Sequence, residues 1–268
     1  MENKFDILMK SYEENIEEHT NNLVNWLKNE FNKTGAKGAV VGMSGGIDCC
    51  VTARLLNLAD IPTTVVMMPY GNSMELSRDR MHAKAFINKF RINDSEIDIT
   101  KTVDELVRVT KMGSYILDRS EGSTKTVEVN LTKEAISNIK PRVRMTSLYT
   151  LGQSMGYLVV GTGNLSERML GYFTKWGDGA CDINPIGNLT KTQVRILAKH
   201  IGIPQEIIDK APSANLFEGQ TDEDELGMTY YDIDRYILTR EGSSEIIERF
   251  NDINKRIQHK LNPIPIPN

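Results

Sequence analysis

The chain has 268 residues, 40% of them hydrophobic, and a formal net charge of −4. This length and composition allow a full hydrophobic core, and we expect one α/β domain that spans residues 1–268. The acidic balance gives no general electrostatic reason to bind nucleic acid, because proteins that do so usually carry a basic excess or a basic stripe. We therefore expect no nucleic-acid partner.

Membrane and metal signals are also missing from the sequence. No stretch has the roughly 18 apolar residues that cross a bilayer, and the charged N-terminus lacks the order of a signal peptide. The three cysteines, with Cys49 and Cys50 adjacent, form neither a disulfide framework nor a zinc-binding spacing. The four histidines are scattered, without a Ser/His/Asp or HExxH arrangement. We expect a cytoplasmic protein with reduced thiols and no membrane association.

Strand and helix patterns alternate through the first half of the chain. The expected elements are an amphipathic helix to about residue 32, a buried strand at 39–43, a helix at 49–59, a strand at 63–68, a helix at 77–90, a strand at 96–99 and a helix at 103–111. Alternation of this kind favours parallel βαβ units.

The second half is richer in helices and loops. The polar segment 113–130 predicts a loop, and 211–224 predicts a mobile loop. The other expected elements are a helix at 141–155, a strand at 157–162, helices at 190–200 and after Pro204, and helices at 230–238 and 244–259. The glycine-rich stretch 162–189 has a composition that suits a functional site more than a core.

A glycine turn, Ser44-Gly45-Gly46-Ile47-Asp48, lies between the first strand and the helix that follows it. The unpaired N–H groups and the positive end of such a helix face outward together, so this position binds anions. Gly45 and Gly46 let the backbone approach a phosphate without a Cβ in the way, and Ser44 adds a hydroxyl donor. A turn that merely connects a strand to a helix explains these residues equally well.

Asp48 favours the functional interpretation of this turn. A carboxylate beside a phosphate is repelled unless a divalent cation lies between them, so Asp48 suggests a Mg²⁺ ligand. The Walker pattern GxxxxGK[ST] is absent. The pattern SGGxD instead resembles the N-type ATP pyrophosphatases, which cleave ATP between its α and β phosphates. Their usual motif is SGGxDS, and Cys49 at the last position removes one expected hydroxyl contact to pyrophosphate.

The region from Asn138 to Lys191 resembles ammonia-dependent NAD synthetase in the order and spacing of its motifs. The motifs are Asn138-Ile-Lys-Pro-Arg142-Val-Arg144, Gly161-Thr162-Gly163-Asn164, Glu167, Gly171-Tyr-Phe-Thr174-Lys175-Trp-Gly-Asp178-Gly179, Asp182, Pro185 and Leu189-Thr190-Lys191. With the glycine turn and segments 211–214 and 222–227, the resemblance covers nearly the whole chain. It implies a Rossmann-like parallel sheet with helices on both faces, of the adenine nucleotide alpha-hydrolase-like class, and no glutamine amidotransferase domain.

The resemblance also implies the reaction. Deamido-NAD would be adenylylated by ATP and then amidated by ammonia, giving NAD, AMP and pyrophosphate. The expected cofactor is Mg²⁺, and the expected assembly is a homodimer. Two rival functions remain: another N-type pyrophosphatase, such as a tRNA-modifying or nucleobase-amidating enzyme, and a non-catalytic nucleotide sensor.

The resemblance assigns roles to individual residues. ATP would contact Ser44, Gly45, Gly46, Ile47, Asp48, Cys49, Thr162, Lys191 and Ser213. Deamido-NAD would contact Asn138, Arg142, Lys175, Asp182, His259 and Lys260. Asp48 and Glu167 would bind Mg²⁺. Asp178 and Lys175 would be catalytic, with Asp178 in the ammonia site, where a carboxylate can attract ammonium and accept its proton.

Several of these residues have plainer interpretations. Lys140, Arg142 and Arg144 crowd cations at a helix start, which the helix dipole disfavours, so either a bound anion or a solvated basic turn explains them. Taken alone, Glu167 reads as an exposed helix acid. Asp178 and Asp182 can simply cap turns, and His259-Lys260 can be a surface helix end. A further departure from several relatives is Met67, where they carry an Arg after the second strand.

Overall fold

The computed structural model describes residues 3–112, 115–118, 125–128, 130–210 and 222–267. Its strands are β1 (Gly38–Gly42), β2 (Thr63–Met67), β3 (Asn93–Glu96), β4 (Tyr115–Asp118), β5 (Lys125–Glu128) and β6 (Tyr157–Val159). Its helices are α1 (Lys4–Glu14), α2 (Ile16–Thr34), α3 (Ile47–Leu58), α4 (Met74–Phe90), α5 (Thr100–Met112), α6 (Lys133–Ser137), α7 (Ile139–Met155), α8 (Leu165–Leu170), α9 (Lys191–His200), α10 (Gln205–Ile208), α11 (Asp222–Leu226), α12 (Tyr230–Thr239), α13 (Ser244–Arg256) and α14 (Gln258–Leu261).

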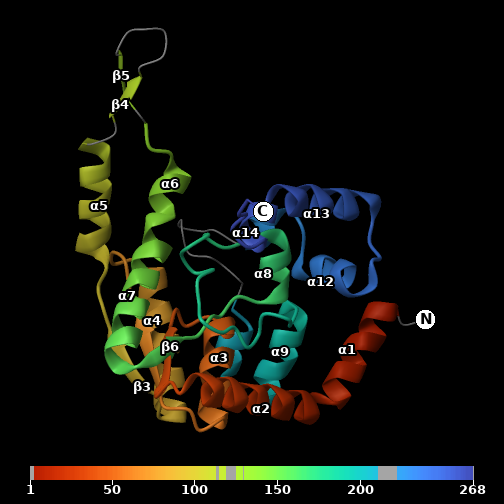
Figure 1. Ribbon diagram of the computed structural model, residues 1–268. Helices are drawn as coiled ribbons and strands as arrows, with labels where there is room; N and C mark the ends of the chain where they lie inside the picture. The colour runs from red at the N-terminus through yellow and green to blue at the C-terminus, as the bar shows by residue number, and fades with distance from the viewer. Residues whose placement is uncertain (1–2, 113–114, 119–124, 129, 211–221, 268) are drawn as a thin grey trace.

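Four parallel strands form the central sheet in the order β3-β2-β1-β6 (Figure 1). Val41 of β1 is in register with Val65 of β2, and Val40 is in register with Val159 of β6 on the other side. Parallel neighbours need a crossover connection, and α3 and α4 supply it between the first three strands. The predicted parallel βαβ units are confirmed.

Helices cover both faces of this sheet, because successive side chains of a strand point to opposite faces. Val41 faces a core that includes residues of α2, α3, α4 and α9. Val40 faces the opposite core, where Val103 of α5 and Val143 of α7 pack. Each fully buried valine of this kind contributes about 1.5–3 kcal/mol of burial free energy. The predicted Rossmann-like arrangement with helices on both faces is therefore confirmed.

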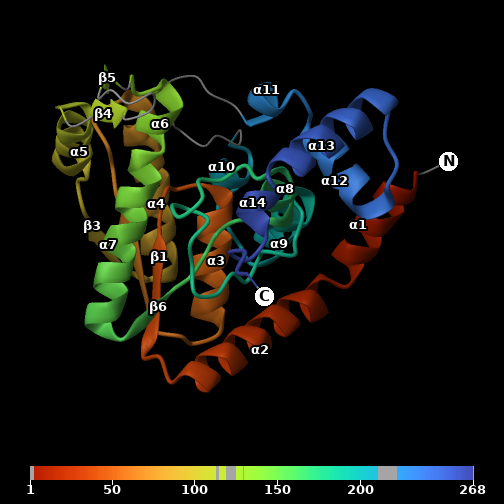
Figure 2. The same cartoon turned by 45° about the horizontal axis from the view of Figure 1, so that its top comes forward.

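The C-terminal helices build a smaller core beside the sheet. Leu170 of α8 packs there with Tyr230 and Ile233 of α12 and with Phe250 of α13. Figure 2 shows this group on the side away from α5 and α7, with α1 next to α12. The space between the two groups of helices lies above the strand ends.

Three elements differ from their predicted bounds. The helix expected up to residue 32 is two helices, which meet at Asn15, a residue type whose side chain competes with helical hydrogen bonds. The third strand covers Asn93–Glu96 instead of 96–99. The prediction misplaced it because this edge strand is polar and largely exposed, and its sequence therefore has no apolar pattern. Within the expected loop 113–130, β4 and β5 form an antiparallel pair, so that prediction was wrong for these strands.

The predicted mobile loop at 211–224 falls mostly outside the described residues. Its last part, 222–224, belongs to α11. Ser213, predicted to contact ATP, also falls outside the described residues. Within the described part of the chain, no helix combines the length and the apolar character needed to cross a membrane.

Candidate active site

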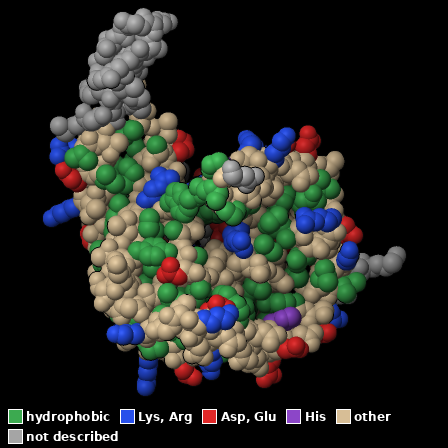
Figure 3. Space-filling model, in the orientation of Figure 1, with side chains coloured by type: hydrophobic (Ala, Val, Ile, Leu, Met, Phe, Trp, Pro, Cys, Tyr) green, Lys and Arg blue, Asp and Glu red, His purple; other side chains and the backbone are tan. Residues whose placement is uncertain are grey.

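A cavity of about 500 Å³ opens at the carboxyl ends of β1 and β2. Open α/β sheets bind their ligands at this edge. Figure 3 shows the molecule hollowed between the part that carries α5 and α7 and the part that carries the C-terminal helices. The cavity wall includes these predicted site residues: Ser44, Gly46, Ile47, Asp48, Cys49, Asn138, Thr162, Glu167, Asp178 and Lys191.

The glycine turn connects β1 to the start of α3. Gly45 has φ +78°, in the left-handed region that favours glycine, and a Cβ there would overlap the carbonyl oxygen of Asp79 on α4. Gly46 is the N-cap of α3 and supplies no side-chain hydrogen bond to the helix. The first N–H groups of α3 thus have no side-chain cap at the cavity wall, as an anion-binding turn requires.

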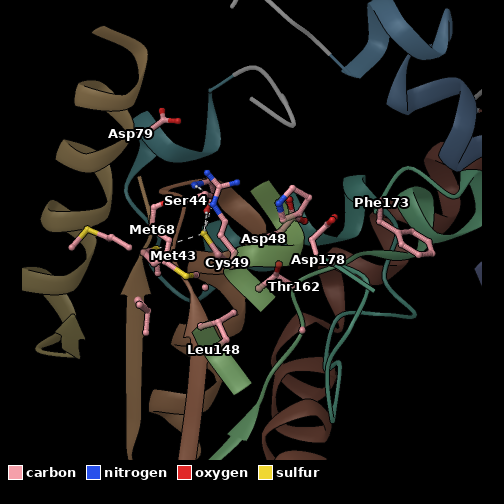
Figure 4. A pocket seen from close by; sticks show the side chains of 18 of the residues that line it. Met43, Ser44, Asp48, Cys49, Met68, Asp79, Leu148, Thr162, Phe173 and Asp178 are labelled. Atoms are coloured by element: carbon pink, nitrogen blue, oxygen red, sulfur yellow. Dashed lines mark hydrogen bonds between the residues drawn. The ribbon is translucent and has the colours of Figure 1, made fainter. Parts of the chain in front are cut away.

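Cys49 lies beneath this turn and is buried. Its thiol is 3.1 Å from the carbonyl oxygen of Gly46 and 3.4 Å from the Ser44 hydroxyl. Figure 4 shows Cys49 beside Ser44 and Met43 at the end of β1. A hydrogen bond from Cys50, followed by bonds from Ser44, lowers the pKa of Cys49 to about 6, although burial opposes the shift. The Cys49 side chain thus contacts the glycine turn from the side of the protein core.

Asp48 and Glu167, the two predicted metal ligands, meet around the ammonium group of Lys191. The Lys191 Nζ lies 2.5 Å from Asp48 Oδ2 and 3.4 Å from Glu167 Oε1. The Lys191 side chain is only 3% exposed. Three residues from α3, α8 and α9, far apart in the sequence, thus form one charged cluster at the N-terminal end of α3.

Asn164 orients both carboxylates. Its side-chain amide donates a 3.0 Å hydrogen bond to Asp48 Oδ1. Asn164 and Glu167 also form a capping box at the start of α8, in which Glu167 Oε2 accepts from the Asn164 N–H at 3.2 Å. Sequence reasoning gave Asn164 no role, although the spacing Asn-x-x-Glu is a known sign of a capping box.

The protonation states of the three groups depend on one another. Burial, and next the charge of Asp48, raise the pKa of Glu167 to about 8. Asp48 and Glu167 in turn raise the pKa of Lys191 above its ordinary value, although burial opposes this. The raised pKa of Lys191 keeps this group an ammonium, and it lies closer to Asp48 than to Glu167. Without a metal ion, we therefore favour a Lys191–Asp48 ion pair beside a protonated Glu167.

This donor set fits Mg²⁺, which proteins hold through one or two carboxylates together with substrate phosphates. Among the described residues, no cluster of three or more His, Cys, Asp or Glu side chains could hold a metal ion. Asp48 and Glu167 would therefore supply the protein oxygens, and the nucleotide and water would supply the others.

A buried carboxylate that the sequence did not reveal joins the helices of this cluster. Asp234 of α12 accepts hydrogen bonds from the Ser166 hydroxyl and, at 2.7 Å, from the backbone N–H of Thr192. The Ser166 hydroxyl also accepts from the backbone N–H of Lys191 at 3.0 Å. Asp234 thus connects the starts of α8 and α9, and these helices carry Glu167 and Lys191.

The opposite wall carries the residues predicted for the acceptor substrate. The Thr174 hydroxyl donates a 2.6 Å hydrogen bond to Asn138 Oδ1, and the Thr174 N–H donates a 2.9 Å bond to Asp178 Oδ1. Asp178 is exposed at the cavity wall, and partial shielding from water by the residues around it raises its pKa. In Figure 4, Asp178 lies near Thr162 and Asp48, and Phe173, another wall residue, lies farther out.

Four further predicted residues are outside the cavity wall and hold the segment 171–178. Arg142 donates to the carbonyl oxygen of Lys175 at 3.3 Å, and the Lys175 ammonium donates to the carbonyl oxygen of His259. Lys260 donates to the carbonyl oxygens of Gly171 and Phe173 at 2.6 and 2.8 Å. In this structure the side chains of Arg142, Lys175 and Lys260 and the backbone carbonyl of His259 support this segment from behind.

Asp182 also lies outside the cavity wall. Its carboxylate accepts from the Val159 N–H at 2.8 Å and from the Tyr149 hydroxyl at 3.2 Å. Just beyond the end of β2, Arg144 donates to the carbonyl oxygen of Met68 at 3.1 Å, and burial lowers its pKa. Arg144 therefore places a cation at the end of β2. Several relatives carry an Arg at this strand end, in the position of Met67.

Comparison with known proteins agrees with this geometry. The sequence profile of the family described as NAD synthase matches residues 19–263. An NH(3)-dependent NAD(+) synthetase of Carboxydothermus hydrogenoformans is 41% identical over 254 residues, which are 94% of this chain and 98% of that protein.

Two solved structures are also similar. One is an NMN synthetase from Francisella tularensis, 36% identical with a TM-score of 0.85, covering 94% of this chain and 98% of the other. The second is an NH3-dependent NAD synthetase from Campylobacter jejuni in complex with the nitrate ion, 25% identical with a TM-score of 0.73, covering 94% of this chain and 99% of the other. With its glycine turn, its charged cluster and these matches, the chain belongs to the NAD synthase family.

Proposed function

We propose that this protein is an ammonia-dependent NAD synthetase, a ligase that amidates deamido-NAD at the expense of ATP. The observation that carries the proposal is the meeting of Asp48, Glu167 and Lys191 at the start of α3, beside the strand ends. A site that bound adenosine alone would not need two half-buried carboxylates and a buried lysine at the helix start proposed to bind the phosphates. The same cluster argues against the nucleotide-sensor alternative.

In the first step, an oxygen of the nicotinate carboxylate attacks the α-phosphorus of ATP. The new O–P bond forms as the bond to the β-phosphate oxygen breaks, and pyrophosphate leaves. The N–H groups at the start of α3 and the Ser44 hydroxyl stabilise the charge that develops on pyrophosphate. Mg²⁺, held by Asp48 and Glu167, would supply further positive charge to the phosphates. Lys191 adds a cation at the same place.

In the second step, ammonia attacks the activated carboxyl carbon, and the bond to AMP breaks. Ammonium must lose a proton before it can attack, and Asp178 faces the cavity on the acceptor wall. Its raised pKa brings the carboxylate closer to the range in which it can accept a proton near neutral pH. The hydrogen bond from the Thr174 N–H holds the Asp178 carboxylate in place.

A second acceptor has a specific observation in its favour. The Francisella tularensis structure with a TM-score of 0.85 is described as an NMN synthetase. The reaction would be the same, with the nicotinate carboxylate presented on a mononucleotide. The wall formed by Asn138, Phe173 and Asp178 would serve the nicotinate end of either acceptor.

The purified protein should be incubated with MgATP, ammonium and either deamido-NAD or nicotinate mononucleotide. We expect the amidated product, AMP and pyrophosphate in equal amounts, with the higher kcat/KM for deamido-NAD. A higher kcat/KM for the mononucleotide would transfer the assignment to NMN synthesis. ADP formation, or no turnover with either acceptor, would reject both.

Ammonia is the proposed nitrogen donor. The proposed organisation is one synthetase domain over residues 1–268. The support is the Carboxydothermus relative, an NH(3)-dependent enzyme that this chain matches over 98% of its length. Replacing ammonium by glutamine should abolish turnover, and a strong preference for glutamine would contradict this part of the proposal. The predicted homodimer and cytoplasmic location belong to the same proposal, and sedimentation would test the dimer.

A further inference from the structure

Lys191 occupies the place between the two carboxylates that a metal ion would need. Its ammonium is 2.5 Å from Asp48 and 3.4 Å from Glu167, and the side chain is 3% exposed. A divalent cation that bound both carboxylates would have to displace this ammonium. Moving a buried ammonium away from its partners is unfavourable unless new partners replace them.

Among the described residues, Asp222 is a further carboxylate whose charge acts on Lys191, and it already accepts a 3.0 Å hydrogen bond from the Tyr230 hydroxyl. The other lysine on the cavity wall, Lys210, is paired with Asp79 on α4. The ring of Tyr230 has its centre 5.3 Å from the Lys191 Nζ, so the ammonium already lies over this aromatic face. The triphosphate of a nucleotide bound at the start of α3 would, by contrast, bring new anionic oxygens within reach. The lysine would then exchange carboxylate partners for phosphate partners.

We propose that Lys191 acts as a stand-in cation, which keeps the Asp48–Glu167 pair closed to divalent metal until a nucleotide is bound. Metal and nucleotide then enter together, and each strengthens the binding of the other. Linkage requires this coupling to be reciprocal. The inference rests on the proposed metal ligands, and it goes beyond a contact between Lys191 and ATP by assigning the lysine a role before ATP binds.

The test measures Mn²⁺ binding, as a stand-in for Mg²⁺, by electron paramagnetic resonance of the free ion. The wild-type chain and Lys191→Met are titrated with and without α,β-methylene ATP, which cannot be cleaved between its α and β phosphates. Without the nucleotide, we expect Lys191→Met to bind Mn²⁺ at least about tenfold more tightly than the wild type. The nucleotide should strengthen Mn²⁺ binding strongly in the wild type and much less in the variant.

Lys210→Met is the matched control, because it removes the same charge from the same cavity without touching Asp48 or Glu167. It should change Mn²⁺ affinity far less than Lys191→Met does. Adding Asp48→Asn to Lys191→Met should abolish the gain, which identifies the site. Circular dichroism checks folding, and Lys191→Gln replaces the Met variant if that variant does not fold.

Two results would overturn the proposal. One is tight Mn²⁺ binding by the wild type without nucleotide, at the affinity seen with it. The other is an equal effect of the Lys191 and Lys210 substitutions, which would indicate a general charge effect. The measurement needs no turnover, so an error in the proposed reaction would leave its outcome readable.

Discussion

Asp234 on α12 accepts a 2.7 Å hydrogen bond from the backbone N–H of Thr192, 42 residues earlier in the chain. Asp234 is completely buried. The N-cap of α9 is Thr190, and the Asp234 carboxylate adds a partner for one more N–H in the first turn of this helix, whose first residue is Lys191. The small C-terminal core thus controls where the site lysine lies.

Asp234→Asn should lower stability and weaken ATP binding. An amide of the same shape has one acceptor oxygen, so one of the donors, the Ser166 hydroxyl or the Thr192 N–H, loses its partner. A hydrogen bond to a charged group contributes about 1.5–3 kcal/mol, and we expect a loss of about 2 kcal/mol in the free energy of unfolding. Urea unfolding measures this loss, and initial rates should show a raised KM for ATP.

Asp232→Asn is the control on the same helix, because its carboxylate interacts locally with the Thr229 hydroxyl at 2.6 Å. It should leave the KM for ATP near the wild-type value. If the Asp234 variant matches the Asp232 variant in both measurements, Asp234 does not position α9.

Gly45→Ala tests the close approach of the glycine turn to α4. The substitution adds the strain of a positive φ, about 1–3 kcal/mol, and a clash with the carbonyl oxygen of Asp79. Gly202→Ala adds the strain alone, because φ is +79° there and nothing lies within 4 Å of the added Cβ. Thermal unfolding should show the larger loss for Gly45→Ala, with weaker ATP binding. Equal losses would mean that α4 can move away.

Glu167→Gln should change how stability depends on pH. The pKa of Glu167 rises from 4.5 to about 8 on folding, so between these values the folded chain holds a proton that the unfolded chain has released. This contribution to stability is complete below the unfolded pKa and is lost as the pH rises through about 8. The slope reaches at most about 1.4 kcal/mol per pH unit for one proton.

Thermal unfolding without divalent metal, from about pH 6 to about pH 8.5, would measure this dependence. The wild type should lose stability relative to Glu167→Gln as the pH rises, because the amide cannot ionise. A constant difference between the two proteins over this range would show that Glu167 stays ionised beside Lys191.

Asp178→Asn should separate the two half-reactions. The amide cannot accept a proton from ammonium, so overall kcat should fall by about 10²–10⁴-fold. Exchange of labelled pyrophosphate into ATP, which needs deamido-NAD and no ammonia, should stay within about threefold of the wild type. An equal loss in both assays would place Asp178 in adenylylation or in acceptor binding instead.

Local patterns predicted the sheet and the phosphate-binding turn from the sequence. Val40 and Val41 belong to a continuous apolar run, and the glycines and Asp48 follow at once, so strand, turn and helix start are all recorded in neighbouring residues. A strand was predicted at 96–99, but edge strand β3 lies at Asn93–Glu96, whose residues are polar and largely exposed. An edge strand is stabilised by backbone hydrogen bonds to one neighbour. These bonds do not require apolar side chains, so the sequence of the strand shows no hydrophobic pattern.

The contacts that assemble the site are long-range, and no local pattern encodes them. Asp234 reads as one acid on an acid-rich helix, and only its neighbour Ser166, 68 residues away, shows what it does. The resemblance placed Asp48, Glu167 and Lys191 in the ATP and metal sites. It gave no indication that Lys191 would lie between the two carboxylates.

Transfer of ¹⁸O tests the adenylylation mechanism most directly. Deamido-NAD labelled with ¹⁸O in its nicotinate carboxylate would be converted to NAD with MgATP and ammonium, and the AMP and pyrophosphate would be analysed by mass spectrometry. Because the carboxylate oxygen stays on the α-phosphorus when ammonia displaces AMP, each AMP should carry one ¹⁸O and pyrophosphate none. Unlabelled AMP, or ¹⁸O in inorganic phosphate or pyrophosphate, would contradict adenylylation at this site.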